Sequence, residues 1–289
     1  MHISQLETPV AIVDLDQLAT NIARLQSYLD EHGIANRPHM KTHKIPEIAH
    51  MQIEAGAVGI ACQKLGEAEI MAQAGIRDIF ISYNIVGEAK LEHLMHLARR
   101  VHLSVTADAE VIVRGLSAAA RATVMTLPVL VECDTGGQRC GVQSPQEAAD
   151  LARVIAGSPG LHFGGLMTHP NQKDTDSFMR EAKALLAVDG LAVERVSGGG
   201  TPCMWQAHTL QELTEHRAGT YVYGDRNIIK SGAMQLKECA LKVITTIVSR
   251  PTTDRGIVDG GSKTFSSDLL GLEGYGLILE YPEARFYAI

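Results

Sequence analysis

The sequence lacks the features that mark secreted, disulfide-bonded and membrane proteins. Its 5 cysteines form an odd set with no C-x-x-C pair, so neither a disulfide framework nor a zinc knuckle is predicted. No segment approaches about 18 uninterrupted apolar residues, and no basic stretch followed by a long apolar run opens the chain. We therefore expect a soluble, unexported protein of the reducing cytoplasm.

An excess of basic charge is also missing. The net charge is −7 and the pI is near 5.9, which argues against a nucleic-acid-binding or anionic-membrane-binding surface, because both need a basic field. The exception is local: the segment Arg37–Lys44, RPHMKTHK, holds the potential cations Arg37, His39, Lys41, His43 and Lys44.

The order of apolar runs and amphipathic segments predicts an α/β fold. A hydrophobic fraction of 45% suffices for a large core, and strands that alternate with helices imply a parallel sheet. Eight strand–helix units by about residue 210 favour a closed (β/α)8 TIM-type barrel, with an open doubly wound sheet as the alternative. No G-x-G-x-x-G follows the first run, which argues against a dinucleotide-binding domain. The expected strands include Val10–Val13 as the first, Pro38–Lys41 as the second, and Val58–Cys62, Ile79–Tyr83, Val101–Val105, Leu127–Cys133, Leu161–Met167 and Val193–Val196.

The texture changes after about residue 233. Cys239–Ser249 is β-branched and alternating, and further short strands are expected at Gly256–Asp259 and Gly276–Glu280. We predict a barrel over residues 1–233 and a partial β domain over residues 234–289. Because the chain stops directly after a strand-like run, we expect it to be a truncated piece.

Lys41 is the candidate nucleophile. A free lysine has a pKa of about 10.4, and nearby positive charge or partial burial favours the neutral amine that forms a Schiff base with an aldehyde cofactor. If the segment is extended, the side chains of His39, Lys41 and His43 would lie on the same face. A solvated basic loop is the alternative for this segment taken alone.

Polar and reactive groups follow the carboxyl ends of the predicted strands, where barrel enzymes place their active sites. The glycine-rich segment from Ser197 to Thr201 and the segment Arg217–Thr220, with Gly219 and Thr220, are suited to a phosphate, because glycine lets the backbone N–H groups approach an anion. An activated lysine on the same rim points to pyridoxal phosphate. The rim comprises Lys41, Gln63, Tyr83, Asp134, Arg139, His169, Ser197, Gly199, Gly200, Thr201, Gly219 and Thr220.

Two of these residues have side chains suited to catalysis. The planar guanidinium of Arg139 fits a phenolate or carboxylate oxygen, although a surface arginine in a turn is the plainer interpretation. His169 could exchange a proton at neutral pH, although a histidine is more often structural. Asp134 is expected to order its own turn.

Six ordered motifs resemble the D-threonine aldolase and D-serine dehydratase group of fold-type III pyridoxal-phosphate enzymes, relatives of alanine racemase. The resemblance runs from about Leu6 to the final residue. The motifs are RPHMKTHK, ACQKLGEAE, VECDTGGQRCGV, SGGGTP, RAGTYVYGD and VDGGSKTFSSD.

The resemblance implies roles for individual residues. Lys41 matches the Schiff-base lysine and Arg139 the arginine beside the cofactor ring, while Thr201, Gly219 and Thr220 match phosphate-binding positions. His169 falls where members carry a tyrosine or histidine near the ring or substrate. The group's divalent metal (Mn, Mg or Zn) is held by residues in a longer tail, so its ligands would lie beyond Ile289.

The leading hypothesis is a pyridoxal-phosphate-dependent lyase that cleaves D-threonine-like β-hydroxy amino acids to glycine and an aldehyde. A D-serine dehydratase uses the same residues, and an amino-acid racemase or a non-catalytic cofactor-binding protein shares the fold. A sugar-phosphate barrel enzyme with Lys41 as its Schiff-base lysine is a more distant alternative. The expected partners are a small D-amino acid and, by resemblance, a second copy in a homodimer.

Overall fold

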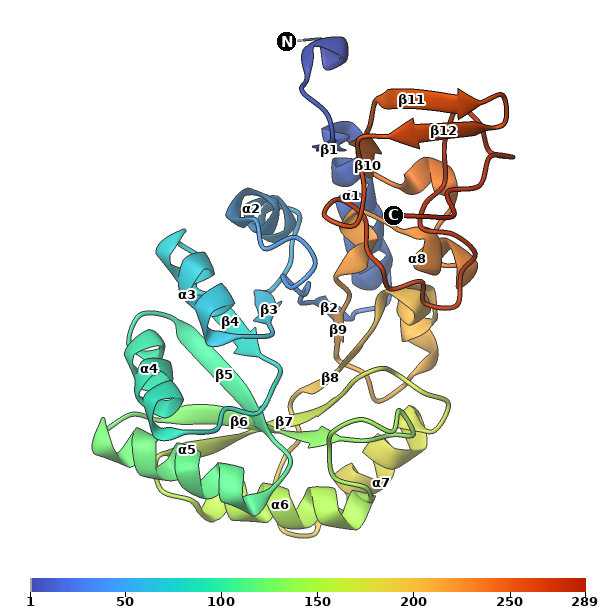
Figure 1. Ribbon diagram of the computed structural model, residues 1–289. Coiled ribbons are helices and arrows are strands. Elements are labelled where there is room, and N and C mark those ends of the chain that lie inside the picture. Colours follow the sequence, from blue (N-terminus) through green and yellow to red (C-terminus); the bar gives the residue numbers. More distant parts are fainter. Residues whose placement is uncertain (1) are drawn as a thin grey trace. The chain divides into compact units, whose positions relative to one another are not determined.

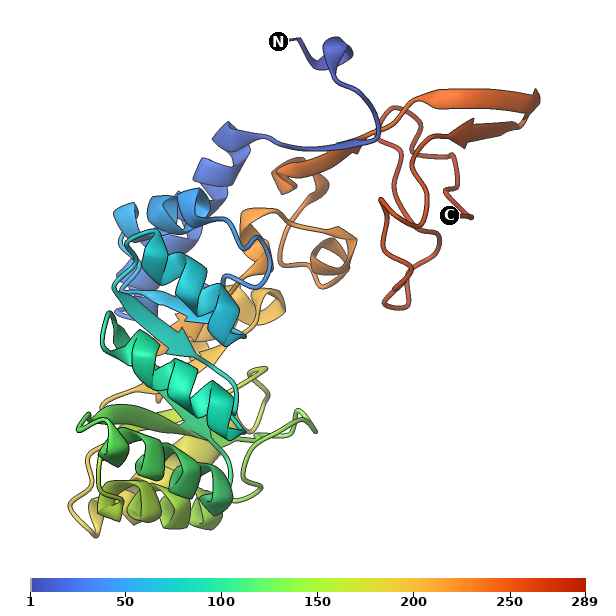
Figure 2. The same cartoon turned by 60° about the vertical axis from the view of Figure 1, so that its left-hand side comes forward.

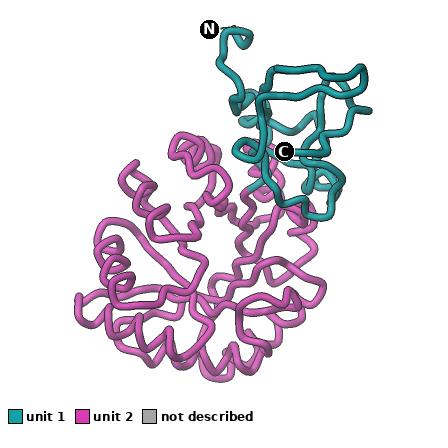
Figure 3. Tube along the Cα trace, viewed as in Figure 1, with its two compact units in different colours: residues 1–21, 220–289 teal, residues 22–219 magenta. Residues whose placement is uncertain are grey.

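A computed structural model describes residues 2–289, which form two compact units (Figure 3). The larger unit comprises residues 22–219, and the smaller one combines the residues up to 21 with residues 220–289. The units divide at residues 219 and 220, whereas the sequence led us to expect a domain boundary after residue 233.

The larger unit is built on eight parallel strands in the order β2-β9-β8-β7-β6-β5-β4-β3 (Figure 1). The ring closes between its two end strands, because Ala61 donates its N–H to the carbonyl of Pro38 and accepts one from Met40, both at 2.8 Å. The predicted (β/α)8 barrel is confirmed. The strands are β2 (Ala35–Asn36), β3 (Ile60–Cys62), β4 (Asp78–Ile81), β5 (His102–Ala107), β6 (Leu127–Cys133), β7 (Leu161–Thr168), β8 (Val196–Gly199) and β9 (Glu215–Arg217).

Helices cover the outside of this sheet (Figures 1 and 2). α6 shows how the sequence starts one: Ser144 Oγ accepts the N–H of Glu147 at 3.2 Å, and Pro145 occupies the first helical position. The helices are α1 (Leu15–Glu31), α2 (Pro46–Glu54), α3 (Leu65–Gln73), α4 (Glu88–Ala98), α5 (Glu110–Ala122), α6 (Pro145–Gly157), α7 (Thr175–Ala187) and the 3-10 helix η2 (Thr201–Thr209).

Alternate residues of the strands point into the barrel, where an apolar cluster of Ala61, Phe80, Leu130 and Met167 is buried. The amino-terminal end of the barrel is charged instead. There Arg37 Nε lies 2.6 Å from Glu215 Oε2, and both side chains are at most 5% exposed. The barrel interior is therefore filled by side chains, and a ligand pocket lies at the opposite rim.

The smaller unit contains two antiparallel strand pairs. β1 (Val10–Val13) pairs with β10 (Leu241–Ile244), and β11 (Ile247–Thr252) pairs with β12 (Arg255–Val258). It also holds α8 (Arg226–Lys230) and the 3-10 helices η1 (Ile3–Gln5), η3 (Thr220–Val222) and η4 (Leu236–Glu238). The strand expected over 276–280 is reduced to a single bridge between Gly276 and Phe286.

The expectation that Val10–Val13 is the first barrel strand was wrong. An apolar run shows that a strand is partly buried but not which strand it pairs with, and β1 pairs with β10 outside the barrel. The eighth strand of the barrel is instead β9, which lies late in the sequence and pairs with β2 and β8. Across residues 2–289, each helix is too short or too polar to cross a bilayer.

Candidate active site

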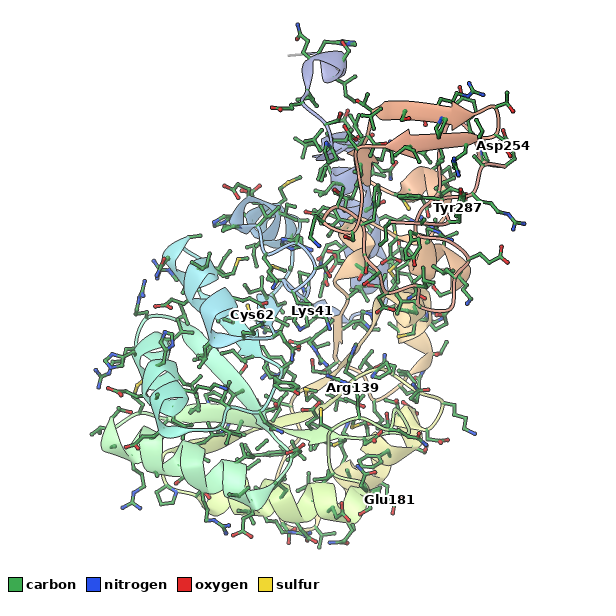
Figure 4. The ribbon with its side chains drawn as sticks, viewed as in Figure 1. Lys41, Cys62, Arg139, Glu181, Asp254 and Tyr287 are labelled. Carbon is green, nitrogen blue, oxygen red and sulfur yellow. The ribbon has the colours of Figure 1, made fainter. Side chains whose placement is uncertain are left out.

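A pocket opens at the carboxyl ends of the barrel strands, with about 290 Å³ of empty space that is continuous with solvent. It includes Lys41, Arg139 and His169, so the structure brings together the three residues that the sequence singled out for catalysis, although their roles stay predictions. Figure 4 labels Lys41 and Arg139, which come from the segments after β2 and β6. The pocket is lined by His39, Lys41, Gln63, Ser82, Arg139, Met167, His169 and Arg217.

The Lys41 side chain is exposed in this pocket. Within residues 2–289, its Nζ has no hydrogen bond or ion pair. Desolvation by its surroundings lowers the pKa of Lys41, the positive charges of Arg139 and Arg217 lower it further, and Glu67 opposes them. The amine is therefore free to react and is biased toward its neutral, nucleophilic form.

The cations that act on Lys41 are not those expected from the sequence. Arg37 lies at the amino-terminal end of the barrel, where it pairs with Glu215 and, at 2.5 Å, with Asp78. Four residues of extended chain span about 13 Å, so Arg37 and Lys41 sit at opposite ends of the same segment.

Lys44 and His43 do not lower the pKa of Lys41 either. Lys44 Nζ pairs with Glu67 Oε1 at 3.1 Å. Burial lowers the pKa of His43 to about 4, so its imidazole is neutral at pH 7. His43 is absent from the pocket lining, because the extended segment turns after Met40. Long-range contacts, rather than neighbours in sequence, therefore activate Lys41.

His169 follows β7 and is neutral at pH 7. Burial lowers its pKa to about 3, and the charges of Arg217, Lys41 and Arg139 act in the same direction. A neutral imidazole at this place can accept a proton, whereas it cannot donate one from its charged form.

Arg139 is carried by a loop that Asp134 holds together. The Asp134 carboxylate accepts the backbone N–H groups of Gly136 at 3.0 Å and of Gln138 and Arg139 at 3.1 Å. The prediction that Asp134 orders its own turn is confirmed. Its carboxylate fixes the backbone from which the Arg139 guanidinium reaches the pocket.

Three of the six predicted phosphate-binding residues come together. Gly200 and Thr201 stand where β8 passes into η2, and the N–H of Gly219 lies 3.3 Å from Thr201 Oγ1. A Cβ on Gly219 would lie 2.8 Å from Thr42 Oγ1 and 2.9 Å from the carbonyl oxygen of His39, which is too close for any side chain. Gly219 therefore packs its backbone directly against the turn that carries Lys41, and Gly200, Thr201 and Gly219 form the predicted phosphate cradle.

The remaining predicted positions differ from one another. Gly199 ends β8, and a Cβ there would lie 2.2 Å from the Arg217 carbonyl oxygen, so its glycine serves strand packing. Thr220 follows Gly219 and begins η3. Ser197 is fully buried, and its hydroxyl contacts Glu215 and Arg217 inside the barrel. Its predicted contact with a phosphate stays a prediction.

Sequence reasoning placed Arg217 in the phosphate-binding segment and His39 on the face of Lys41, but it gave neither a role in the pocket. Arg217 is the last residue of β9, is buried, and donates to the carbonyl of Thr168 at 2.8 Å. Burial lowers its pKa to about 10, so it keeps its charge. A signal was present: Arg217 stands two residues before Gly219, where a strand should end at the same rim.

Comparison with known proteins places this site in a family. Residues 13–227 match the family described as alanine racemase, N-terminal domain. The chain belongs to this family. Among its relatives, a D-threonine aldolase from Arthrobacter sp. is 34% identical over 92% of this chain and 74% of the relative. A D-threo-3-hydroxyaspartate dehydratase from Delftia sp. (strain HT23) is 33% identical over 91% of this chain and 73% of the relative.

A solved structure of a family relative agrees with the sequence matches. The D-threonine aldolase from Filomicrobium marinum superposes with a TM-score of 0.87 at 32% identity, covering 98% of this chain and 80% of that chain. The predicted resemblance and the predicted enzyme class, a pyridoxal-phosphate-dependent lyase, are confirmed.

Pyridoxal phosphate is the cofactor expected for the family, and the residues fit it. Lys41 offers an unpaired amine of lowered pKa for the aldehyde, Arg139 offers a guanidinium in the same pocket, and Gly219 lies against the turn that carries Lys41. For the predicted divalent metal, no three His, Cys, Asp or Glu side chains in residues 2–289 are grouped to hold an ion. The metal stays a prediction.

Proposed function

We propose that this chain cleaves the Cα–Cβ bond of D-β-hydroxy amino acids of the D-threonine type, giving glycine and an aldehyde. The observation that carries the proposal is the unpaired amine of Lys41, which shares one cationic pocket with a neutral histidine, His169. The similarity to D-threonine aldolases supports this choice of reaction.

Four residues would hold the cofactor in this proposal: Lys41 and Arg139 from the pocket lining, and Thr201 and Gly219 from outside it. Lys41 would hold the cofactor aldehyde, Arg139 would lie beside the ring, and Thr201 and Gly219 would bind the phosphate. When bound, pyridoxal phosphate supplies an electron sink for the negative charge that bond cleavage leaves at Cα. The lining contains three cationic side chains and no carboxylate, which suits a cofactor phosphate and a substrate carboxylate together.

His169 would take the proton of the substrate's β-hydroxyl group. Loss of this proton lets the electron pair of the O–H bond form the second bond of the aldehyde carbonyl, while the electron pair of the breaking Cα–Cβ bond stays at Cα. A pKa of about 3 makes His169 a weak base in the empty pocket. The anionic groups of cofactor and substrate would offset Arg217, Lys41 and Arg139, and so raise the pKa of His169 toward the working pH.

Dehydration of the same substrates is the second candidate. The similarity to a D-threo-3-hydroxyaspartate dehydratase favours it. The pocket residues would be the same, but the β-hydroxyl would leave as water instead of becoming an aldehyde oxygen. A homodimer and a divalent metal, which rest on the family resemblance alone, and a cytoplasmic location, which rests on the cysteine content, complete the proposal.

Product analysis separates the two reactions. Purified protein loaded with pyridoxal phosphate is incubated with D-threonine and with D-serine, and glycine plus aldehyde is measured against ammonia plus 2-oxo acid. We expect glycine and acetaldehyde from D-threonine. Lys41→Ala should abolish turnover and the cofactor absorbance, while the nearby Lys44→Ala should keep both. Turnover that survives Lys41→Ala would refute the proposed role of this amine.

A further inference from the structure

His39 occupies a special place between the barrel and Lys41. Its own N–H donates to the carbonyl of Ala218 at 2.8 Å, and the next N–H, of Met40, donates to Ala61 at 2.8 Å. The N–H of Lys41 has left this ladder and donates instead to the ring atom His39 Nδ1 at 3.2 Å. At Lys41, the His39 imidazole therefore replaces the neighbouring strand as the hydrogen-bond acceptor.

This contact fixes the protonation of the ring. A backbone N–H can only donate, so Nδ1 must accept and carries no hydrogen. The neutral ring then bears its hydrogen on Nε2, which faces Ser82 Oγ at 3.4 Å. His39 is 8% exposed, and burial holds its pKa well below the ordinary value, with Lys41, Arg217, His169 and His43 acting in the same direction. The ring is thus a permanent acceptor for the Lys41 N–H at neutral pH.

The same short turn also borders the phosphate cradle. Gly219 has no room for a Cβ because the His39 carbonyl oxygen and Thr42 Oγ1 would lie within 2.9 Å of it. Lys44 closes the turn by donating its N–H to the carbonyl of Met40 at 2.8 Å. The backbone of residues 39–44 therefore fixes the position of the Lys41 side chain's first atoms relative to Gly219.

We propose that His39 is a positioning residue for Lys41: its ring accepts the Lys41 N–H and thereby fixes the backbone from which the amine reaches the cofactor. The inference rests on the proposed role of Lys41 as the residue that holds the aldehyde. A lysine side chain has four rotatable bonds, so a misplaced backbone spreads its amine over many positions and lowers the share that can react.

Two neutral substitutions separate this role from packing. In His39→Asn, the amide oxygen can accept the N–H two residues later, as asparagine does in Asx-turns. In His39→Gln, the polar group is moved outward toward Ser82, and the acceptor for Lys41 is lost. Both variants remove the titratable ring, so the difference between them reports the acceptor for the Lys41 N–H.

The first measurement is the rate at which the cofactor-free full chain captures pyridoxal phosphate at pH 7, followed by absorbance. We expect His39→Gln to be slower by about tenfold, equivalent to about 1.4 kcal/mol, and His39→Asn to stay within about twofold of the unaltered chain. Equal rates for both variants would overturn the proposal. So would a folded His39→Asn protein whose capture is about tenfold slower than that of the unaltered chain, and this result stands even if His39→Gln fails to fold.

The second measurement needs no cofactor. Lys41 is labelled by reductive 13C-methylation, and its titration is followed by NMR. In His39→Gln the pKa of Lys41 should rise toward that of a free lysine, because the amine is no longer held beside Arg139 and Arg217. An unchanged titration would overturn the positioning role. Cofactor capture by Lys41→Ala would instead overturn the proposed function, so the two failures are distinguishable.

Discussion

Acidification should destabilise this fold through its buried histidines. The pKa is lowered to about 4 for His43 and His216 and to about 3 for His169, in each case first by burial. In the unfolded chain a histidine titrates near 6.5. Between these pKa values the unfolded state binds more protons than the folded state. The stability present above pH 6.5 is therefore lost as the pH falls toward 4.

The size of the loss follows from the two pKa values. Between pH 7 and pH 5, a histidine that titrates at about 4 when folded and about 6.5 when unfolded contributes a loss of about 2 kcal/mol. Three such groups give about 6 kcal/mol, and His39 adds to it with the same sign. A typical domain has about 5–15 kcal/mol in total, so acid should remove a large part of the stability.

Urea unfolding of the cofactor-free chain at pH 7, 6 and 5, followed by circular dichroism, measures this effect. His216→Phe is the matched variant, because His216 is fully buried on β9 and does not line the pocket. The variant should lose about 2 kcal/mol less than the unaltered chain between pH 7 and pH 5. Parallel curves for the two proteins would refute the reasoning for this histidine.

Two substitutions test the charges around and below the pocket. Arg139→Gln should raise the pKa of Lys41, whereas Lys44→Gln should not, because Lys44 is paired with Glu67. The pH dependence of reductive methylation at Lys41 compares the two variants. Equal effects would contradict the role of Arg139 in lowering the pKa of Lys41. Arg37→Met should lower the free energy of unfolding in urea by about 3–5 kcal/mol, because the buried Glu215 carboxylate loses its ion-pair partner. A loss below about 1 kcal/mol would show that the pair is no stronger than one on the surface.

The alternation of apolar runs and helices predicted the barrel but not the strand with which it ends. β9 reads Glu-His-Arg, which carries no apolar signal. Its charges are tolerated inside the barrel because Glu215 meets Arg37, and Arg217 meets Ser197 and the carbonyl of Thr168. These partners come from distant parts of the chain, so no local pattern could show that this segment is a buried strand.

The pocket was predictable where it depends on strand ends and not where it depends on strand pairing. Lys41, Arg139 and His169 each follow a strand, and the carboxyl ends of parallel strands meet at one rim. The role of Arg217 in the pocket was missed together with its strand. Arg37 was counted as a neighbour of Lys41 because the two are close in sequence, although an extended chain carries them apart.

The segment that completes the ring of strands is also the one that bears Lys41. Only a few backbone bonds join it to β3, and Pro38 can offer no N–H to that seam. When heat or denaturant first parts this joint, the amine moves away from its surroundings while the helices are still intact. If this joint opens before the rest of the barrel, loss of activity on heating should precede the loss of helical circular dichroism.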